Sequence, residues 1–291
     1  MAAVAMCIAL LLCAGGCAPP RPDRPVIGAK NFTEQVLLGE LLAQHIEART
    51  GLKVDRRFYL AGSYICQQAL VAGRIDGYVE YTGTALTAIL KQPVDKDPAR
   101  VFATVRRLYH ERYAVDAGPS LGFENTFAMI VRSEDAERLR VRKLSEAAAA
   151  APQWKLGVGY EFEERPDGLR GLERAYGLKF DGAPRTMDLG LLYRAIAQRQ
   201  VDIIAGNSTD GPIQSLHLTV LADDRHYFPP YDAVPLFRED AYRRWPQMRA
   251  AVAELAGKVD AQEMQAMNEA VDGQHRNPVE VVREFRARKG L

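Results

Sequence analysis

Short β-like runs alternate with amphipathic helical segments along almost the whole chain, and this alternation most constrains the fold. Val26–Gly28 precedes a helical stretch whose apolar residues recur with a 3.6-residue period and which Gly51 would end as a C-cap. The pattern continues with strands expected at 54–59, 75–79, 126–131, 156–159 and 201–205 and helices at 63–72, 98–112, 166–177 and 189–198. Such alternation predicts βαβ units, a mostly parallel sheet and an α/β fold.

Two extended passages, near residues 120–130 and 229–238, divide this pattern, and three helices are expected after the second. A chain of 291 residues is long enough for two lobes, each with its own core. If both passages connect the same two lobes, the second lobe is inserted into the first. We therefore expect two Rossmann-like lobes joined by two crossover strands, the plan of a hinged binding protein. The predicted division is a leader at 1–17, a Pro-rich spacer at 18–25, lobe 1 at 26–122 and 219–291, and lobe 2 at 123–218.

The first seventeen residues contain no charged side chain. Their apolar core, Val4–Leu12, has the length of a signal-peptide core and is too short to span a bilayer. Small residues at 14–16 lead into Cys17, which resembles a bacterial lipoprotein signal whose cysteine is lipidated. Ala14 replaces the usual Leu, and no Lys or Arg precedes the core, so a plain secretory leader is the alternative. We expect a periplasmic or other extracytoplasmic protein, anchored to the membrane through Cys17.

Composition and motifs exclude several functions. The chain has 38 basic and 37 acidic residues, whereas nucleic-acid binding needs a basic stripe, so no nucleic-acid partner is expected. Cys66 is the one cysteine after Cys17, and its apolar helical surroundings predict a buried, inert thiol. No Cys/His cluster, phosphate loop, HExxH or GxSxG motif occurs, so we expect no metal, no cofactor and no catalytic residue.

Seven strings, in this order and spacing, resemble the glycine betaine, choline and carnitine binding proteins of osmoprotectant ABC importers. They are Gly28–Gln35 (GAKNFTEQ), Asp76–Thr84 (DGYVEYTGT), Asn125–Phe127 (NTF), Glu163–Leu169 (EERPDGL), Met187–Tyr193 (MDLGLLY), Ser208–Gly211 (STDG) and Asp223–Tyr231 (DDRHYFPPY). The resemblance spans about residues 26–290. It implies a type II-like periplasmic binding protein whose ligand is held between the lobes, with permease subunits as partners, and we expect a monomer.

The resemblance also implies a ligand site. Tyrosine faces would attract a quaternary ammonium, which cannot donate N–H hydrogen bonds, and a guanidinium fork suits a carboxylate. Lys30 and Thr84 would meet the carboxylate from lobe 1, and Arg165 from lobe 2, just before a helix that Pro166 is expected to begin. The remaining implied positions are Tyr81 and Tyr231 in the aromatic cage and Asn125 at the cationic head.

Two positions depart from the family pattern, since Phe127 and Asn207 stand where it has cage tyrosines. Phe127 keeps an aromatic face, whereas Asn207 replaces one with an amide. Either the chain is a weak osmolyte binder, or it is adapted to a ligand that needs hydrogen bonds.

The function expected is capture of a quaternary ammonium osmolyte for an ABC importer by hinge closure. The alternatives are the same fold binding another zwitterion or an amino-acid-like solute, or a secreted enzyme or ligand sensor on this scaffold. The acidic pair Glu163–Glu164 is interpreted as a partner of Arg165 rather than an acid/base pair.

Overall fold

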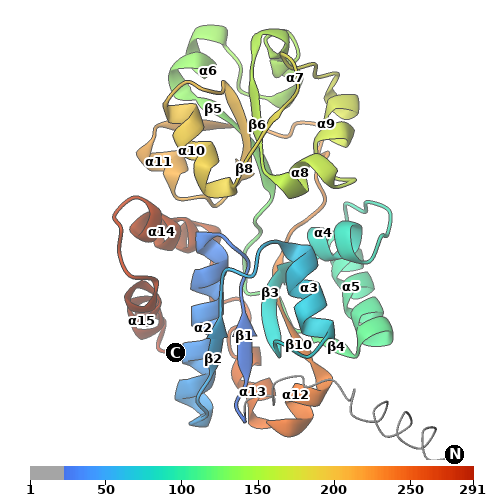
Figure 1. Ribbon diagram of the computed structural model, residues 1–291, viewed down its shortest axis with the longest axis vertical. Coiled ribbons are helices and arrows are strands. Elements are labelled where there is room, and N and C mark those ends of the chain that lie inside the picture. Colours follow the sequence, from blue (N-terminus) through green and yellow to red (C-terminus); the bar gives the residue numbers. More distant parts are fainter. Residues whose placement is uncertain (1–22) are drawn as a thin grey trace, which may run out of the picture.

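The computed structural model describes residues 23–291 and confirms the α/β fold class, with two five-stranded sheets that carry helices on their faces. The two sheets belong to two lobes arranged end to end, and two chain segments run between them (Figure 1). The predictions for the leader, for Cys17 and for most of the spacer fall on residues 1–22 and lie outside the described residues.

The lower lobe in Figure 1 is built from both ends of the described chain. Its N-terminal elements are β1 (Val26–Gly28), α2 (Thr33–Thr50), β2 (Asp55–Arg57), α3 (Ser63–Val71), β3 (Gly77–Tyr81), α4 (Thr82–Thr84), the π-helical η1 (Ala85–Ile89), α5 (Pro98–Tyr113) and β4 (Val115–Ala117). Its C-terminal elements are β10 (Ala233–Arg238), α12 (Glu239–Arg244), α13 (Gln247–Ala253), α14 (Ala261–Asp272) and α15 (Pro278–Lys289).

The upper lobe in Figure 1 is one continuous stretch of chain. Its elements are β5 (Phe127–Arg132), α6 (Ser133–Leu139), α7 (Leu144–Ala147), the 3-10 helix η2 (Ala151–Gln153), β6 (Leu156–Val158), α8 (Tyr160–Glu164), α9 (Leu169–Tyr176), β7 (Arg185–Thr186), α10 (Leu189–Ala197), β8 (Ile203–Asn207), α11 (Pro212–Ser215) and β9 (Leu218–Leu221).

The two sheets have equivalent topologies, with strand orders β2-β1-β3-β10-β4 and β7-β6-β8-β5-β9. In each sheet the first three strands are parallel, whereas the fourth runs antiparallel to both neighbours. The sheets are therefore mixed rather than mostly parallel. The antiparallel strands, β5 and β10, are the ones the chain enters directly after passing from one lobe to the other.

The two connecting segments, residues 118–126 and 222–232, also pair with each other through an antiparallel bridge between Glu124 and Asp232. The division into lobes stays a prediction, and strand pairing differs from it in one respect. Strand β9 pairs with β5 in the upper sheet, although the predicted boundary at residue 219 assigns it to lobe 1.

The ends of two helices were predicted correctly from glycines in the sequence. Gly51 and Gly177 follow α2 and α9 in the left-handed conformation, with φ of 71° and 67°. Four helices rather than three close the chain, because Trp245 and Pro246 separate α12 from α13. Helices α13, α14 and α15 pack against α2. Cys66 is buried within the core, as expected, and burial raises the pKa of its thiol to about 12.

Candidate functional site

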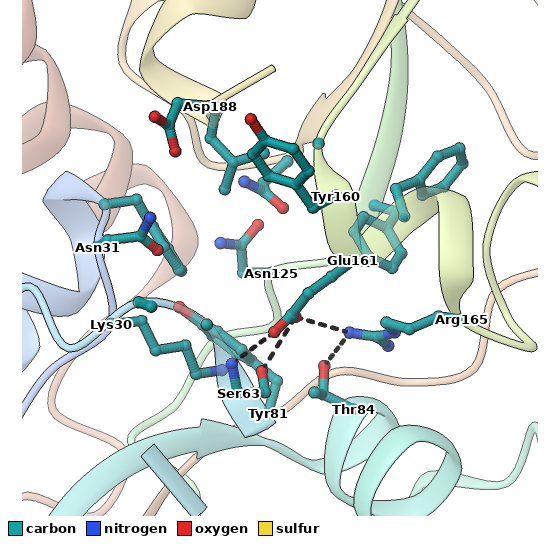
Figure 2. Close-up of a pocket in the computed structure, with 18 of the residues that line it drawn as sticks. Lys30, Asn31, Ser63, Tyr81, Thr84, Asn125, Tyr160, Glu161, Arg165 and Asp188 are labelled. Carbon is teal, nitrogen blue, oxygen red and sulfur yellow. Dashed lines mark hydrogen bonds and ion pairs between the residues drawn. The ribbon is translucent and has the colours of Figure 1, made fainter. Parts of the chain in front are cut away.

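A cavity of about 340 Å³ lies between the two lobes (Figure 2). Its walls come from both lobes and from both connecting segments. All eight residues predicted to bind ligand line it: Lys30, Tyr81, Thr84, Asn125, Phe127, Arg165, Asn207 and Tyr231. The fold thus brings these eight residues together, while their contacts with a ligand stay predictions.

Six aromatic residues line the cavity, and the three that the sequence predicted come from three different elements; the six are Phe32, Tyr81, Phe127, Tyr160, Phe162 and Tyr231. Tyr81 ends β3, Phe127 begins β5, and Tyr231 precedes β10 in the second connecting segment. The rings of Phe127 and Tyr231 meet edge to face with their centroids 5.8 Å apart. Aromatic rings grouped in this way can attract a cation through their faces.

The two departures from the family pattern lie side by side. Phe127 and Asn207 are directly opposite each other on the antiparallel strands β5 and β8. Directly opposed residues share one face of a sheet, and both of these line the cavity. The Asn207 amide nitrogen donates to Asp210 Oδ2 at 3.2 Å, so this polar group is held in place.

Arg165 is buried and tied to both lobes. Its guanidinium donates two hydrogen bonds to Asp167 and one, of 2.9 Å, to Thr84 Oγ1 in the other lobe. Tyr231 donates to the same Asp167 carboxylate at 2.6 Å. Burial opposes ionisation of Asp167, but the charge and hydrogen bonds of Arg165 hold the pKa of that carboxyl below its usual value. A fixed guanidinium is therefore present at the cavity wall.

The predicted helix start at Pro166 is wrong. Helix α8 ends at Glu164, α9 begins only at Leu169, and the Gly168 N–H donates to the Arg165 carbonyl. Pro166 therefore occupies the second position of a turn, where its fixed φ is equally suitable. No helix N-terminus, with its partial positive charge, therefore lies directly after Arg165 as was expected. The acidic partner is also different, because Arg165 pairs with Asp167, and Glu163 accepts a hydrogen bond from Thr186.

Lys30 is likewise buried and paired. Its ammonium forms an ion pair with Glu80, a residue of β3 with a fully buried side chain, and lies 4.9 Å from the centroid of the Tyr81 ring. The Tyr78 hydroxyl and the Tyr81 backbone N–H donate to the same carboxylate. Lys30 is thus fixed in the cavity wall rather than solvated.

Glu34 is a functional candidate that the sequence did not indicate. This buried carboxylate at the start of α2 accepts hydrogen bonds from Tyr81, Asn125, Asn268 and Thr209. Burial raises its pKa, and the four hydrogen bonds act in the opposite direction. Because Thr209 belongs to the upper lobe, Glu34 links both lobes next to the Tyr81 hydroxyl.

Glu161 is a second candidate that sequence analysis missed. Its carboxylate reaches from α8 to the first residue of α3, where Ser63 N–H donates at 2.6 Å and Ser63 Oγ at 3.2 Å (Figure 2). It also lies 4.0 Å from Arg165. The only signal available in the sequence was an acidic residue near Arg165, and Glu163 and Glu164 provided the same signal.

Asp210 lies partly buried next to Asn207, whose backbone N–H and side-chain amide donate to its carboxylate, and it is expected to make stability depend on pH. Desolvation by burial raises its pKa to about 7, against hydrogen bonds from Tyr193 and Asn207. Folding thus raises this pKa from 3.8. Between pH 3.8 and about 7, Asp210 is therefore protonated in the folded protein and ionised in the unfolded chain. Stability should fall as pH rises through that window, by at most about 1.4 kcal/mol per pH unit.

The measurement is the free energy of unfolding of the protein and of Asp210→Asn at several pH values from 5 to 8. The asparagine keeps an acceptor for Tyr193 but cannot titrate. Glu34 and Asp272 also have raised pKa values and titrate in both proteins. We expect the Asp210→Asn curve to be flatter; parallel curves would contradict the assignment.

Residues 23–291 contain no group of three or more His, Cys, Asp or Glu side chains that could hold a metal ion. None of their helices combines the length and apolar character that a membrane span requires.

The sequence matches a family model described as the substrate binding domain of ABC-type glycine betaine transport systems over residues 25–288. It is 33% identical to the carnitine transport binding protein OpuCC of Listeria monocytogenes, over 89% of this chain and 84% of that protein. It is also 33% identical to a glycine-betaine-binding protein of Pseudomonas aeruginosa, over 89% of this chain and 86% of that protein.

The solved structures agree with the sequence matches. The crystal structure of a glycine betaine/carnitine/choline ABC transporter protein superimposes with a TM-score of 0.76 at 31% identity, covering 91% of this chain and 98% of the other. Apo YehZ of Escherichia coli gives a TM-score of 0.66 at 27% identity, covering 92% and 99%. These likenesses confirm the predicted type II periplasmic binding protein fold. The chain therefore belongs to the family of substrate-binding domains of ABC-type glycine betaine transport systems, and it is an extracytoplasmic substrate-binding protein of an ABC importer.

Proposed function

We propose that this protein binds a quaternary ammonium osmolyte in the cavity between its lobes and transfers it, chemically unchanged, to the permease subunits of its importer. The observation that carries the proposal is the group of three aromatic side chains, Tyr81, Phe127 and Tyr231, at one cavity between the lobes. The cavity volume of about 340 Å³ suits a small solute. The proteins named for carnitine and glycine betaine among its relatives support the same ligand class.

Binding would act by stabilising the closed arrangement of the lobes. Contacts between the lobes already surround the cavity, from Arg165 to Thr84 and from Glu161 to Ser63. A ligand that touches both lobes lowers the free energy of the closed state only, and so shifts the population toward that state. The permease would then recognise the closed form.

We further propose that the protein is exported and held at the membrane by a lipid on Cys17, and that it acts as a monomer. The apolar leader and the small residues before Cys17 support the first proposal. Radiolabelled palmitate should be incorporated into the protein in cells but not into Cys17→Ser. Equal labelling of both would place the lipid elsewhere.

A titration of the purified protein with glycine betaine, choline and carnitine by calorimetry tests the ligand class. Phe127→Leu should weaken binding of a quaternary ammonium about five- to thirtyfold, because one aromatic face is lost. Phe228→Leu is the matched control, since this ring lies 6.0 Å from Phe127 but does not line the cavity. Its effect should stay within about twofold.

Equal effects of the two substitutions would attribute the loss to packing rather than to the cage. The proposal would be refuted if the protein bound an amino acid, or another zwitterion without a quaternary ammonium group, and showed no saturable binding of any quaternary ammonium compound. That outcome would favour a ligand recognised through the fixed Asn207 amide.

A further inference from the structure

The charges around the cavity differ from those that a zwitterion would require. Four charged side chains line it: Lys30, Arg165, Glu161 and Asp188. Each of the two cations already has its own buried carboxylate, Glu80 for Lys30 and Asp167 for Arg165, and both carboxylates are fully inaccessible to solvent. The charged side chains of the lining and the two ion-pair partners together bring four carboxylates against two cations.

Ion pairs of this kind reduce the attraction that either cation offers to a ligand anion. When a buried cation is paired with a carboxylate at hydrogen-bond distance, the negative charge of that carboxylate cancels most of the attraction between the cation and a ligand anion. Arg165 donates through Nε and one terminal nitrogen to Asp167, and through the other to Thr84. The fork that would bind a ligand carboxylate through two parallel hydrogen bonds is thus occupied by Asp167.

Glu161 occupies the remaining favourable position for an anion. Its carboxylate accepts from the N–H and the hydroxyl of Ser63 and lies 4.0 Å from Arg165. The backbone at Gly62 permits this approach, because a Cβ there would lie 2.1 Å from Glu161 Oε1. Figure 2 shows the side chain extended across the cavity, from α8 in one lobe to Ser63 in the other.

We infer that Glu161 is a specificity-determining residue that makes the cavity select a quaternary ammonium alcohol, a monocation, over a betaine zwitterion. The inference rests on the proposed function and refines its ligand class. A betaine carboxylate must either displace Glu161 from Ser63 or lie beside it, and two negative charges this close repel each other. An alcohol brings no second negative charge, and its hydroxyl can donate a charge-assisted hydrogen bond to the Glu161 carboxylate.

The test is calorimetric titration of choline and glycine betaine into the purified protein and into Glu161→Gln, at one pH and one ionic strength. The Glu161 side chain is 29% exposed, and glutamine can still accept from Ser63, so the variant should fold; a thermal melt checks this. The unsubstituted protein should prefer choline. Removing the charge should shift the ratio of the two dissociation constants about ten- to hundredfold toward glycine betaine.

Glu164→Gln is the matched control, because this exposed residue lies on the same helix, carries the same charge and does not line the cavity. Its preference should equal that of the unsubstituted protein. A preference unchanged by Glu161→Gln would overturn the inference but leave the proposed function standing. The same conclusion would follow if Glu161→Gln lowered both dissociation constants by the same factor, since Glu161 would then oppose the binding of both ligands equally. Failure of both ligands to bind either protein would overturn the proposed function and, with it, the inference.

Discussion

Substitution of Arg165 by methionine is expected to lower the free energy of unfolding by about 3–5 kcal/mol and to weaken ligand binding, because the closed state loses a contact between the lobes. The Arg165 and Asp167 side chains are 3% and 0% exposed, so the substitution leaves a buried carboxylate without its counter-charge. It also removes the hydrogen bond from Arg165 to Thr84 between the lobes. Urea unfolding, followed by both fluorescence and circular dichroism, measures the change.

The double variant Arg165→Met/Asp167→Asn separates the two effects. Removing both charges avoids the uncompensated carboxylate, and asparagine can still accept from the Tyr231 hydroxyl. We expect the double variant to recover most of the stability lost in Arg165→Met, because a buried ion pair contributes little net stability compared with neutral groups. Ligand binding should remain weakened in both, because methionine at position 165 cannot donate to Thr84 in the other lobe. If the single variant were as stable as the double variant, the Asp167 carboxylate would not need the Arg165 charge to compensate its burial.

Much of the fold could be predicted because its signals are local. Gly51 and Gly177 end helices through their own left-handed conformation, and apolar periodicity located α2. The direction of β5 and β10 could not be predicted, since it depends on where the chain re-enters each sheet. Pro166 shows the limit of a local signal, because proline suits a turn as well as a helix start, and the choice depends on Asp167 folding back onto Arg165.

The site was predictable where a family pattern marked it and not elsewhere. All eight residues taken from the resemblance line the cavity, including the two that depart from the pattern. Glu34 and Glu161 were missed because their partners are distant in sequence. Glu34 meets Thr209 across 175 residues and Glu161 meets Ser63 across 98, and neither spacing leaves a pattern in the sequence.

Substitution of Glu34 by glutamine is expected to loosen the contact between the lobes as well as to destabilise the fold. Its carboxylate accepts from Tyr81, Asn125, Asn268 and Thr209, and it is the group that these four donors share. A glutamine amide would turn an N–H₂ group toward two of these donors. A buried donor without an acceptor costs about 1–3 kcal/mol, so the free energy of unfolding should fall by at least about 2 kcal/mol.

Glu40→Gln distinguishes loss of a buried carboxylate from loss of lobe closure. Glu40 is also buried on α2, but its hydrogen-bond partners, Arg56 and Gln44, belong to the same lobe. Both variants should lose stability. Only Glu34→Gln should increase the radius of gyration measured by small-angle X-ray scattering in the presence of ligand, and only it should weaken ligand binding. The reason is that, of the two, only Glu34 accepts hydrogen bonds both from Tyr81 of its own lobe and from Thr209 of the other lobe. If both variants opened equally, closure would depend on the general stability of α2, and the four hydrogen bonds of Glu34 would have no special part in it.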